Sequence, residues 1–251
     1  MLVAENEAGA RLLAWNAEKD DNFTCPECRT DVTLKKGKVN IHHYAHKPDA
    51  DCLYGVGESY YHMSVKRDIY EALREHPDVR KCEVERSFKS CRPDVSFYVN
   101  DTPVVVEMQC SNIDLYDLDR RMCRYSELGC AQIWLIKSVK KRDDGLYSPT
   151  KWQDELHERY WGRLYVFHND ATVYPLKLSK HKRWIEPVEF YREGELIEIP
   201  GKWFEAKRLS EGIAGPYIHL VNDFSAGGTD GDLWCDNLGT DWMYENEEDS
   251  E

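Results

Sequence analysis

The chain has 251 residues, 41% of them hydrophobic and 31% charged, and this composition excludes a wholly disordered protein. The length is enough for one medium-sized domain and a small accessory module. The formal net charge of -13 is unusual for a protein that binds nucleic acid, but the charge is unevenly distributed. Residues 209–251 carry eleven Asp and Glu and no Lys or Arg, so the rest of the chain is close to neutral.

No run of 18 apolar residues is present, and the N-terminal residues lack the basic-then-apolar order of a signal peptide. We therefore expect a cytoplasmic protein without membrane contact. The nine cysteines are odd in number and scattered over a mid-sized chain, unlike the dense cysteines of secreted disulfide scaffolds. This usage favours reduced thiols together with a metal site.

Residues 1–57 are expected to form a small zinc-binding module built on a β-hairpin. Cys25 and Cys28 form a CxxC knuckle, in which both thiolates can reach one ion. Two further ligands are expected among three downstream residues, His43, His46 and Cys52. We expect the last two to complete a closed tetrahedral Zn²⁺ site with a structural role, with His43 as the alternative. Free thiols with surface histidines are the competing interpretation.

Residues 58–140 predict an α/β domain. Apolar residues recur at helical spacing from residue 58 to residue 76, and Pro77 ends the run. Three strand-like runs, a second helix and a buried strand follow, at 82–88, 92–99, 103–109, 114–128 and 131–136. The expected core is therefore a mixed sheet flanked by helices.

Residues 141–221 predict a β-rich extension that begins with a helix over 151–161. Asn169 and Asp170 lie between two strand-like runs and indicate a hairpin, and a second hairpin is expected from Val188 to Ile199. Beyond residue 222, Gly, Asp, Asn and Ser dominate, so we expect residues 222–251 to be an acidic, flexible tail.

Two carboxylates in neighbouring predicted strands are the main candidates for chemistry. Asp94 and Glu107 are thirteen residues apart across a turn, so adjacent antiparallel strands can bring them together on one sheet face. Paired carboxylates are costly unless a cation neutralises them, and Mg²⁺ or Mn²⁺ takes oxygen ligands of this kind. With Glu58 and Gln109 they form a set suited to holding one or two ions and activating a water near a phosphodiester.

Some of these residues are also compatible with a purely structural role. Glu107 lies inside an apolar run, so a buried ion pair with Arg92 or Arg121 explains it equally simply. The position of Glu58 near a helix N-terminus is favourable without any ligand. His62, one turn later, is as readily a buried core histidine as a site residue.

The motifs taken together resemble the CoiA competence family. They are CPEC, HYAH with a nearby Cys, GESYYHMSVK, RPDV, VEMQCS, RRMCRY and IWLI, spread over residues 23–136. The resemblance implies a restriction-endonuclease-like core of the PD-(D/E)xK class, with Glu58, Asp94 and Glu107 as acidic site residues. Gln109 stands where that superfamily usually has Lys, and we expect Lys66 to supply the missing positive charge.

Basic residues cluster at three points, where they are expected either to bind phosphates, with a neighbouring aromatic ring stacking on bases, or to be solvated loops. They are found at Lys35–Lys38, at Lys137–Arg142 and at Lys180–Arg183, which Trp184 follows. The acidic segment carries Trp234, Trp242 and Tyr244, so we expect it either to occupy a basic surface of this chain or a protein partner, or to be a plain solubilising tail.

The sequence therefore predicts a metal-dependent nuclease acting on nucleic acid, DNA rather than RNA. The alternative is a nuclease-like fold that binds DNA or a protein without cutting, since Gln109 cannot act as a cation. A zinc-stapled adaptor that works only through protein contacts is a third hypothesis.

Overall fold

The computed structural model describes residues 1–244 except positions 20, 49, 53, 56, 89–90, 194 and 229–230. The N-terminal module is a five-stranded antiparallel sheet in the order β2-β1-β3-β4-β5. Its strands are β1 Val3–Asn6, β2 Arg11–Leu13, β3 Phe23–Thr24, β4 Asp31–Lys35 and β5 His43–His46. The expected hairpin is the β4–β5 pair, and three more strands extend it. The buried core of this sheet is small, with Phe23 against Tyr44 as its only close aromatic pair among the described residues, and cores of this size usually come with a further staple such as a metal ion.

The central domain follows the predicted order of helix, three strands, helix and strand. Its elements are α1 Tyr60–Arg74, β6 Val79–Val84, β7 Val95–Val99, β8 Thr102–Gln109, α2 Leu115–Glu127, β9 Ala131–Ile136, α3 Lys151–Arg159 and β10 Leu164–Asn169. Strands β6, β7 and β8 are antiparallel, whereas β8, β9 and β10 are parallel. The sheet is mixed and carries helices, as predicted and as expected of a nuclease-like fold. All six residues of β9 are buried, which explains why its sequence is apolar except for Gln132.

The helices begin where the sequence provides capping side chains. Ser59 precedes α1 and accepts a hydrogen bond from the His62 amide, and Asp114 caps α2 in the same way through the Tyr116 amide. Glu58 therefore lies just before helix α1 instead of in its first turn. Helix α1 contacts β6, β7, β8 and β10, and α2 contacts β9.

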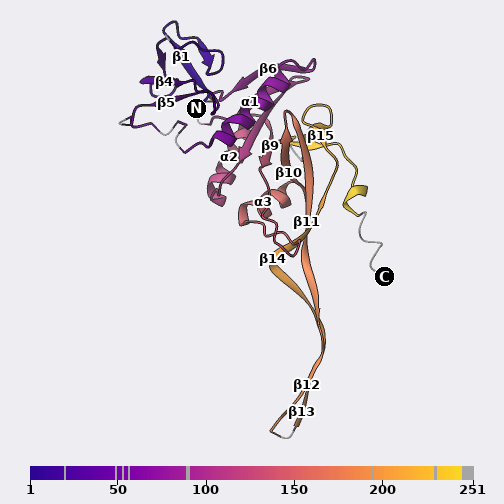
Figure 1. The fold of residues 1–251 in the computed structure, drawn as a ribbon. Coiled ribbons are helices and arrows are strands. Elements are labelled where there is room, and N and C mark those ends of the chain that lie inside the picture. The colour runs from indigo at the N-terminus through magenta and orange to yellow at the C-terminus, as the bar shows by residue number, and fades with distance from the viewer. Residues whose placement is uncertain are drawn as a thin grey trace.

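Two long strands leave the central sheet and form an arm (Figure 1). They are β11 Thr172–Ile185 and β14 Lys202–Ala214, and they pair antiparallel, with a register shift between Lys180 and Lys182. Strands β12 Val188–Arg192 and β13 Glu195–Ile199 continue the arm to its tip as a separate hairpin. Both predicted hairpins are present, but no pattern in the sequence predicted a projecting arm.

The acidic C-terminal segment differs from the flexible tail that we expected. Its described part contains β15 Ile218–His219, β16 Phe224–Gly227, β17 Leu233–Asp236 and a 3-10 turn at Asp241–Met243. Strand β17 pairs with β16 and lies parallel to β9 of the central sheet. Trp234 and Trp242 are buried, and the Trp234 indole donates to the Leu220 carbonyl at 2.6 Å. Burial of these aromatic side chains stabilises an ordered structure up to Met243 despite the acidic composition. The remainder of the tail, from residue 245, lies outside the described residues.

In the described part of the chain, no helix has the length and apolar character needed to cross a membrane.

Candidate functional site

Three cysteines and one histidine of the N-terminal module form a compact group. One sulfur or nitrogen atom from each of Cys25, Cys28, His46 and Cys52 lies within 4.8 Å of the others, and such a group could hold a structural metal ion. The Glu27 amide points at the Cys25 sulfur at 3.4 Å, and the Thr30 hydroxyl lowers the pKa of Cys28 to about 6. Sulfur and imidazole donors in this number suit tetrahedral zinc.

His43 lies outside this group. Its Nδ1 atom is 2.9 Å from the Ile41 carbonyl oxygen, and its ring contacts the Tyr60 ring edge-on. The hairpin β4–β5 explains the difference, because His43 and His46 stand three residues apart on β5 and therefore project to opposite sides of the strand.

A second group forms where helix α1 meets the start of strand β7. Ligand atoms of Glu58, His62 and Asp94 lie within 4.8 Å of one another. His62 Nε2 is 2.7 Å from one Asp94 oxygen, which also accepts from the Met108 amide at 2.8 Å. Two carboxylates and one imidazole are ligands that Mn²⁺ and related divalent ions accept, so the donors present fit such an ion.

The protonation states in this group depend on each other. Burial opposes the charged form of His62, but the adjacent Asp94 carboxylate raises the pKa of His62 above its ordinary value. Burial alone would raise the pKa of Asp94, whereas His62 and Lys66 hold it below its ordinary value. Asp94 is therefore ionised near neutral pH and available as a ligand.

Lys66 occupies the centre of the acidic groups and is almost fully buried. Its ammonium group forms an ion pair with Glu58, lies 2.5 Å from a Glu85 oxygen and 3.7 Å from Asp94. Because Lys66 is enclosed, its nearest charged partners are these three carboxylates.

Glu85 is a member of this network that the sequence patterns did not reveal. It is 3% exposed and accepts hydrogen bonds from Lys66, from the Tyr54 hydroxyl and from the Leu2 amide. Its backbone has φ = 51°, a left-handed conformation that a non-glycine residue rarely adopts without support from its surroundings. Apolar and polar residues alternate through residues 82–88, as in a continuous strand, so the sequence did not predict a turn at Glu85.

The acid stability of the protein is expected to depend on Glu85. Burial alone would raise its pKa, but the Lys66 ammonium lowers the pKa of Glu85 to about 2 from an ordinary 4.5. Its contribution to stability is therefore complete above the ordinary value and is lost as the pH falls toward about 2. Between about pH 6 and pH 3.5 the wild type should lose roughly 1.5 kcal/mol relative to Glu85→Gln, measured by urea unfolding. An unchanged difference between the two proteins at both pH values would contradict this assignment.

The side chains of Glu107 and Gln109 bind partners outside the acidic group. The register pairs Val95 with Val106, so Asp94, the residue just before β7, lies next to Glu107 of β8. The Glu107 carboxylate, however, is bound by Arg121 and by the Tyr125 hydroxyl, both from helix α2. Burial raises the pKa of Glu107 to about 7, an effect that Arg121 opposes. Of the two ion pairs that the apolar run around Glu107 suggested, the one with Arg121 is therefore present.

Gln109 lies at the end of β8 and donates from its side chain to the Ser111 carbonyl at 2.7 Å. Among the residues with described positions, Glu107 does not join the Glu58, His62 and Asp94 group.

Two hollows lie between the N-terminal module and helix α1, and the first of them borders the acidic group at Glu58. One, of about 370 Å³, is lined by residues of β5 and the following loop together with Glu58 and Tyr60. The other, of about 530 Å³, runs along helix α1 and is lined by Trp15, Lys38, Tyr61 and Arg67 among others. The N-terminal module therefore supplies one wall of the approach to Glu58.

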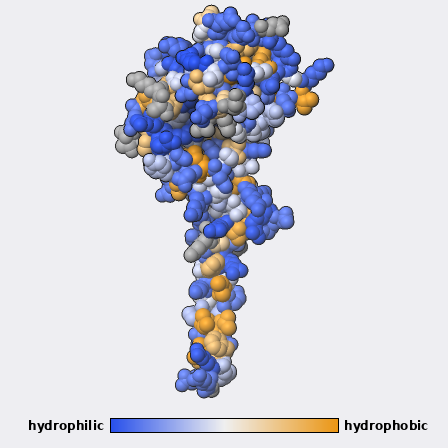
Figure 2. Space-filling view, turned by 90° about the vertical axis from the view of Figure 1, so that its left-hand side faces the viewer, coloured by the Kyte–Doolittle hydropathy of each residue, from blue (hydrophilic) through white to orange (hydrophobic). Residues whose placement is uncertain are grey.

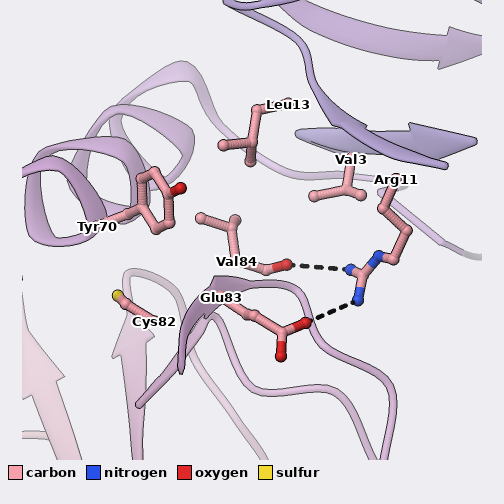
Figure 3. Close-up of a pocket in the computed structure, with 7 residues that line it drawn as sticks. All are labelled: Val3, Arg11, Leu13, Tyr70, Cys82, Glu83 and Val84. Atoms are coloured by element: carbon pink, nitrogen blue, oxygen red, sulfur yellow. Dashed lines mark hydrogen bonds and ion pairs between the residues drawn. The ribbon is translucent and has the colours of Figure 1, made fainter. Parts of the chain in front are cut away.

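A smaller cavity of about 170 Å³ lies at the junction of β2 with β6 (Figure 3). Arg11 reaches across it to the Val84 carbonyl at 3.1 Å and to Glu83 at 3.4 Å, as the dashed lines show. The same guanidinium donates to the Glu85 carbonyl at 2.9 Å. Arg11 thus ties the N-terminal module to the turn that carries Glu85.

Comparison with known proteins agrees with the arrangement of two linked units. Residues 6–55 match the family model for the N-terminal domain of competence protein CoiA, and residues 58–178 match the model for its nuclease-like domain. Competence protein CoiA of Bacillus subtilis (strain 168) is 27% identical over 140 residues, which cover 54% of this chain and 38% of that relative. No solved structure gives a significant match. The chain belongs to the CoiA competence family.

Proposed function

We propose that this chain is a metal-dependent nuclease that hydrolyses phosphodiester bonds of DNA. The observation that carries the proposal is the convergence of Glu58, His62 and Asp94 within 4.8 Å in the domain that matches the nuclease-like family model. A bound Mg²⁺ or Mn²⁺ ion would polarise a phosphate oxygen and lower the pKa of a water. Glu58, His62 and Asp94 would hold that ion.

The buried network would keep these ligands in place. Lys66 and the Met108 amide fix the Asp94 carboxylate from two sides, so little reorganisation is needed when a cation binds. Lys66 is 3% exposed, so in this proposal it positions the carboxylates and does not contact the scissile phosphate.

The groove beside helix α1 supports nucleic acid as the substrate. Trp15, Tyr60 and Tyr61 offer aromatic surfaces, and Lys38 and Arg67 offer cations along the same groove. Aromatic rings can stack on bases while the cations contact phosphates. Unpaired bases stack more readily than paired ones, so the groove favours a strand that is at least locally single.

We further propose that Cys25, Cys28, His46 and Cys52 bind a structural Zn²⁺ ion. Four protein ligands leave no open position for a water or substrate, which is typical of a structural zinc site. All nine cysteines, each within the described part of the chain, are free thiols, and this supports the expected cytoplasmic location.

The test is cleavage of supercoiled plasmid and of single-stranded DNA with Mg²⁺ or Mn²⁺, using zinc-loaded protein. Asp94→Asn and Glu58→Gln are expected to reduce the cleavage rate at least about a hundredfold, because each removes a charge that holds the ion. Asp143→Asn, at an exposed position away from the site, is the matched control and should cut like the wild type. Glu107→Gln in the same assay shows whether Glu107 leaves Arg121 to act as a ligand.

A second candidate is a nuclease-like fold that binds DNA without cutting it. It is favoured by the Glu107 carboxylate being held by Arg121 and Tyr125, and by Lys66 already neutralising the other carboxylates. Metal-independent DNA binding with no cleavage by folded, zinc-loaded protein would select this candidate over the enzyme.

A further inference from the structure

The N-terminal module and the central domain are joined by contacts that lie largely inside the molecule. Figure 2, which looks onto the side of the module, shows the two units as one continuous and mainly hydrophilic body above the arm. One of these contacts involves Arg92, which the sequence suggested as a possible partner of Glu107. Arg92 instead forms an ion pair with Glu27, which lies between the two cysteines of the knuckle.

Arg92 also lies on the ring of Tyr54. Its guanidinium carbon is 3.9 Å from the ring centroid, which is a close cation–π contact. Tyr54 follows the metal ligand Cys52 by two residues, so Arg92 contacts the chain next to the first and next to the last metal ligand. The Arg92 side chain is 17% exposed, and its Nε atom is buried without a hydrogen-bond partner among the described residues. Because such a guanidinium is costly to desolvate, stability alone explains its position poorly.

The Tyr54 hydroxyl extends this contact into the acidic network. It donates to one oxygen of Glu85. Burial, together with the Glu85 carboxylate, raises the pKa of Tyr54 well above its ordinary value, so the hydroxyl keeps its proton. The other oxygen of Glu85 accepts from Lys66 at 2.5 Å. A chain of direct contacts therefore joins Glu27, Arg92, Tyr54, Glu85 and Lys66.

The last of these contacts determines how strongly Lys66 competes with a bound cation. Its ammonium is shared between Glu85 and two residues of the proposed ion site, Glu58 and Asp94. A Glu85 carboxylate that is held in place draws the ammonium away from those two ligands, whereas a displaced one leaves the ammonium to them. Because the ammonium and a divalent ion compete for the same carboxylates, the position of Glu85 affects the affinity of the site for the ion.

Arg92 also restrains Asp94 through the backbone. Only Pro93 separates the two residues, and the proline ring fixes one backbone dihedral angle. The Asp94 carbonyl accepts from the Glu85 amide at 3.0 Å, so both carboxylates belong to the same stretch of paired backbone. Anchoring the Arg92 side chain on the knuckle therefore restrains the segment that carries Asp94.

We propose that Arg92 is a positioning residue that couples the metal-ligand group of the N-terminal module to the proposed divalent-ion site. An ordered knuckle holds Arg92 in place, and the contacts beyond it keep Lys66 from occupying the ion site. The inference rests on the proposed function and deepens it, because it assigns how one unit controls the ion site of the other. Loss of order in the knuckle would lower the affinity for a divalent ion although every ligand of that ion is present.

The test is a titration of zinc-loaded protein with Mn²⁺, followed by the electron paramagnetic resonance signal of the free ion. The wild type is expected to bind Mn²⁺ at a site that Asp94→Asn lacks. Glu27→Gln, Arg92→Gln and Tyr54→Phe should each weaken this binding about fivefold or more, a typical size for coupling between two sites. Zinc content and circular dichroism are measured for each variant to show that it is folded.

A double variant separates this coupling from a local effect of Arg92 on Asp94. If Arg92 transmits the position of the knuckle, Glu27→Gln should weaken Mn²⁺ binding in the wild type but have little further effect in Arg92→Gln. Glu18→Gln, at an exposed position of the same module, is the matched control and should bind Mn²⁺ like the wild type. The Glu27 side chain is 57% exposed, so Glu27→Gln keeps the test valid if Arg92→Gln does not fold.

The possible failures point to different errors. A wild type that binds no Mn²⁺ would overturn the proposed ion site and this inference with it. A wild type that binds Mn²⁺, together with variants that bind it equally tightly, would overturn the coupling alone. The coupling is also wrong if Arg92→Gln weakens binding while Glu27→Gln and Tyr54→Phe do not, since Arg92 then acts only through its neighbour Asp94.

Discussion

Replacing Lys66 by methionine is expected to lower the free energy of unfolding by about 3–5 kcal/mol, among the largest effects of any single substitution in this chain. Lys66 is the side-chain cation shared by the carboxylates of Glu58, Glu85 and Asp94. Without Lys66, these three buried carboxylates keep only the N-terminal ammonium beside Glu58 and His62 beside Asp94 as nearby cations, so part of their charge is left uncompensated. The measurement is urea unfolding of metal-free, zinc-loaded protein near neutral pH.

Two further variants separate this cause from a simple change in packing. Lys66→Met combined with Glu85→Gln should recover part of the lost stability, because one of the uncompensated charges is gone. Lys140→Met, at an exposed position, should change the free energy of unfolding by less than about 0.5 kcal/mol. Mn²⁺ should stabilise Lys66→Met more than the wild type, since the ion would replace the missing cation. A loss below about 1 kcal/mol for Lys66→Met would mean that the carboxylates are not charged in the folded protein.

Removing the proposed zinc ion is expected to unfold the N-terminal module while the central sheet stays folded. The module has a small core in which Cys25 is fully buried, and structural zinc sites contribute on the order of 10 kcal/mol or more to folding. Cys28→Ser, or treatment with a strong chelator, should therefore abolish protection from hydrogen exchange over β1–β5. Protection of β7, β8 and β9 should remain, because their core lies within the central domain.

Cys123→Ser is the matched control for this experiment, because Cys123 is exposed on helix α2 and lies outside the metal-ligand group. It should leave exchange in the module unchanged. The loss of zinc should also weaken the acidic group, since Arg11 and the Leu2 amide tie the module to Val84 and Glu85. A module that stays protected without metal would show that its sheet needs no staple.

The regular elements of the central domain could be predicted because each has a periodic pattern of its own. Helical spacing of apolar residues marked α1 and α2. The run of β9, apolar except for Gln132, followed from burial on both of its faces. The metal-ligand group could also be predicted, because one short segment joined by a hairpin contains the CxxC knuckle together with His46 and Cys52. The choice of His46 over His43 depended on strand geometry that spacing alone does not fix.

Several features depend on contacts between distant residues, which no local pattern encodes. Glu85 is buried through partners 83 and 31 residues earlier, at Leu2 and Tyr54, and through Lys66. The sequence indicated that Glu107 is a buried charge. Only the packing of α2 against the sheet determines that its ion-pair partner is Arg121. The C-terminal segment looked flexible because its acidic composition was weighed above Trp234, whose burial beside β9 requires the folded sheet.

Anomalous scattering from crystals of zinc-loaded protein soaked with Mn²⁺ would locate a divalent ion bound by Glu58, His62 and Asp94. We expect a manganese peak among the ligand atoms of these three residues, and no such peak in crystals of Asp94→Asn grown and soaked in the same way. A manganese peak only at other positions, with Lys66 still bridging Glu58 and Asp94, would show that these residues form no metal centre and that the domain is a nuclease-like fold without one.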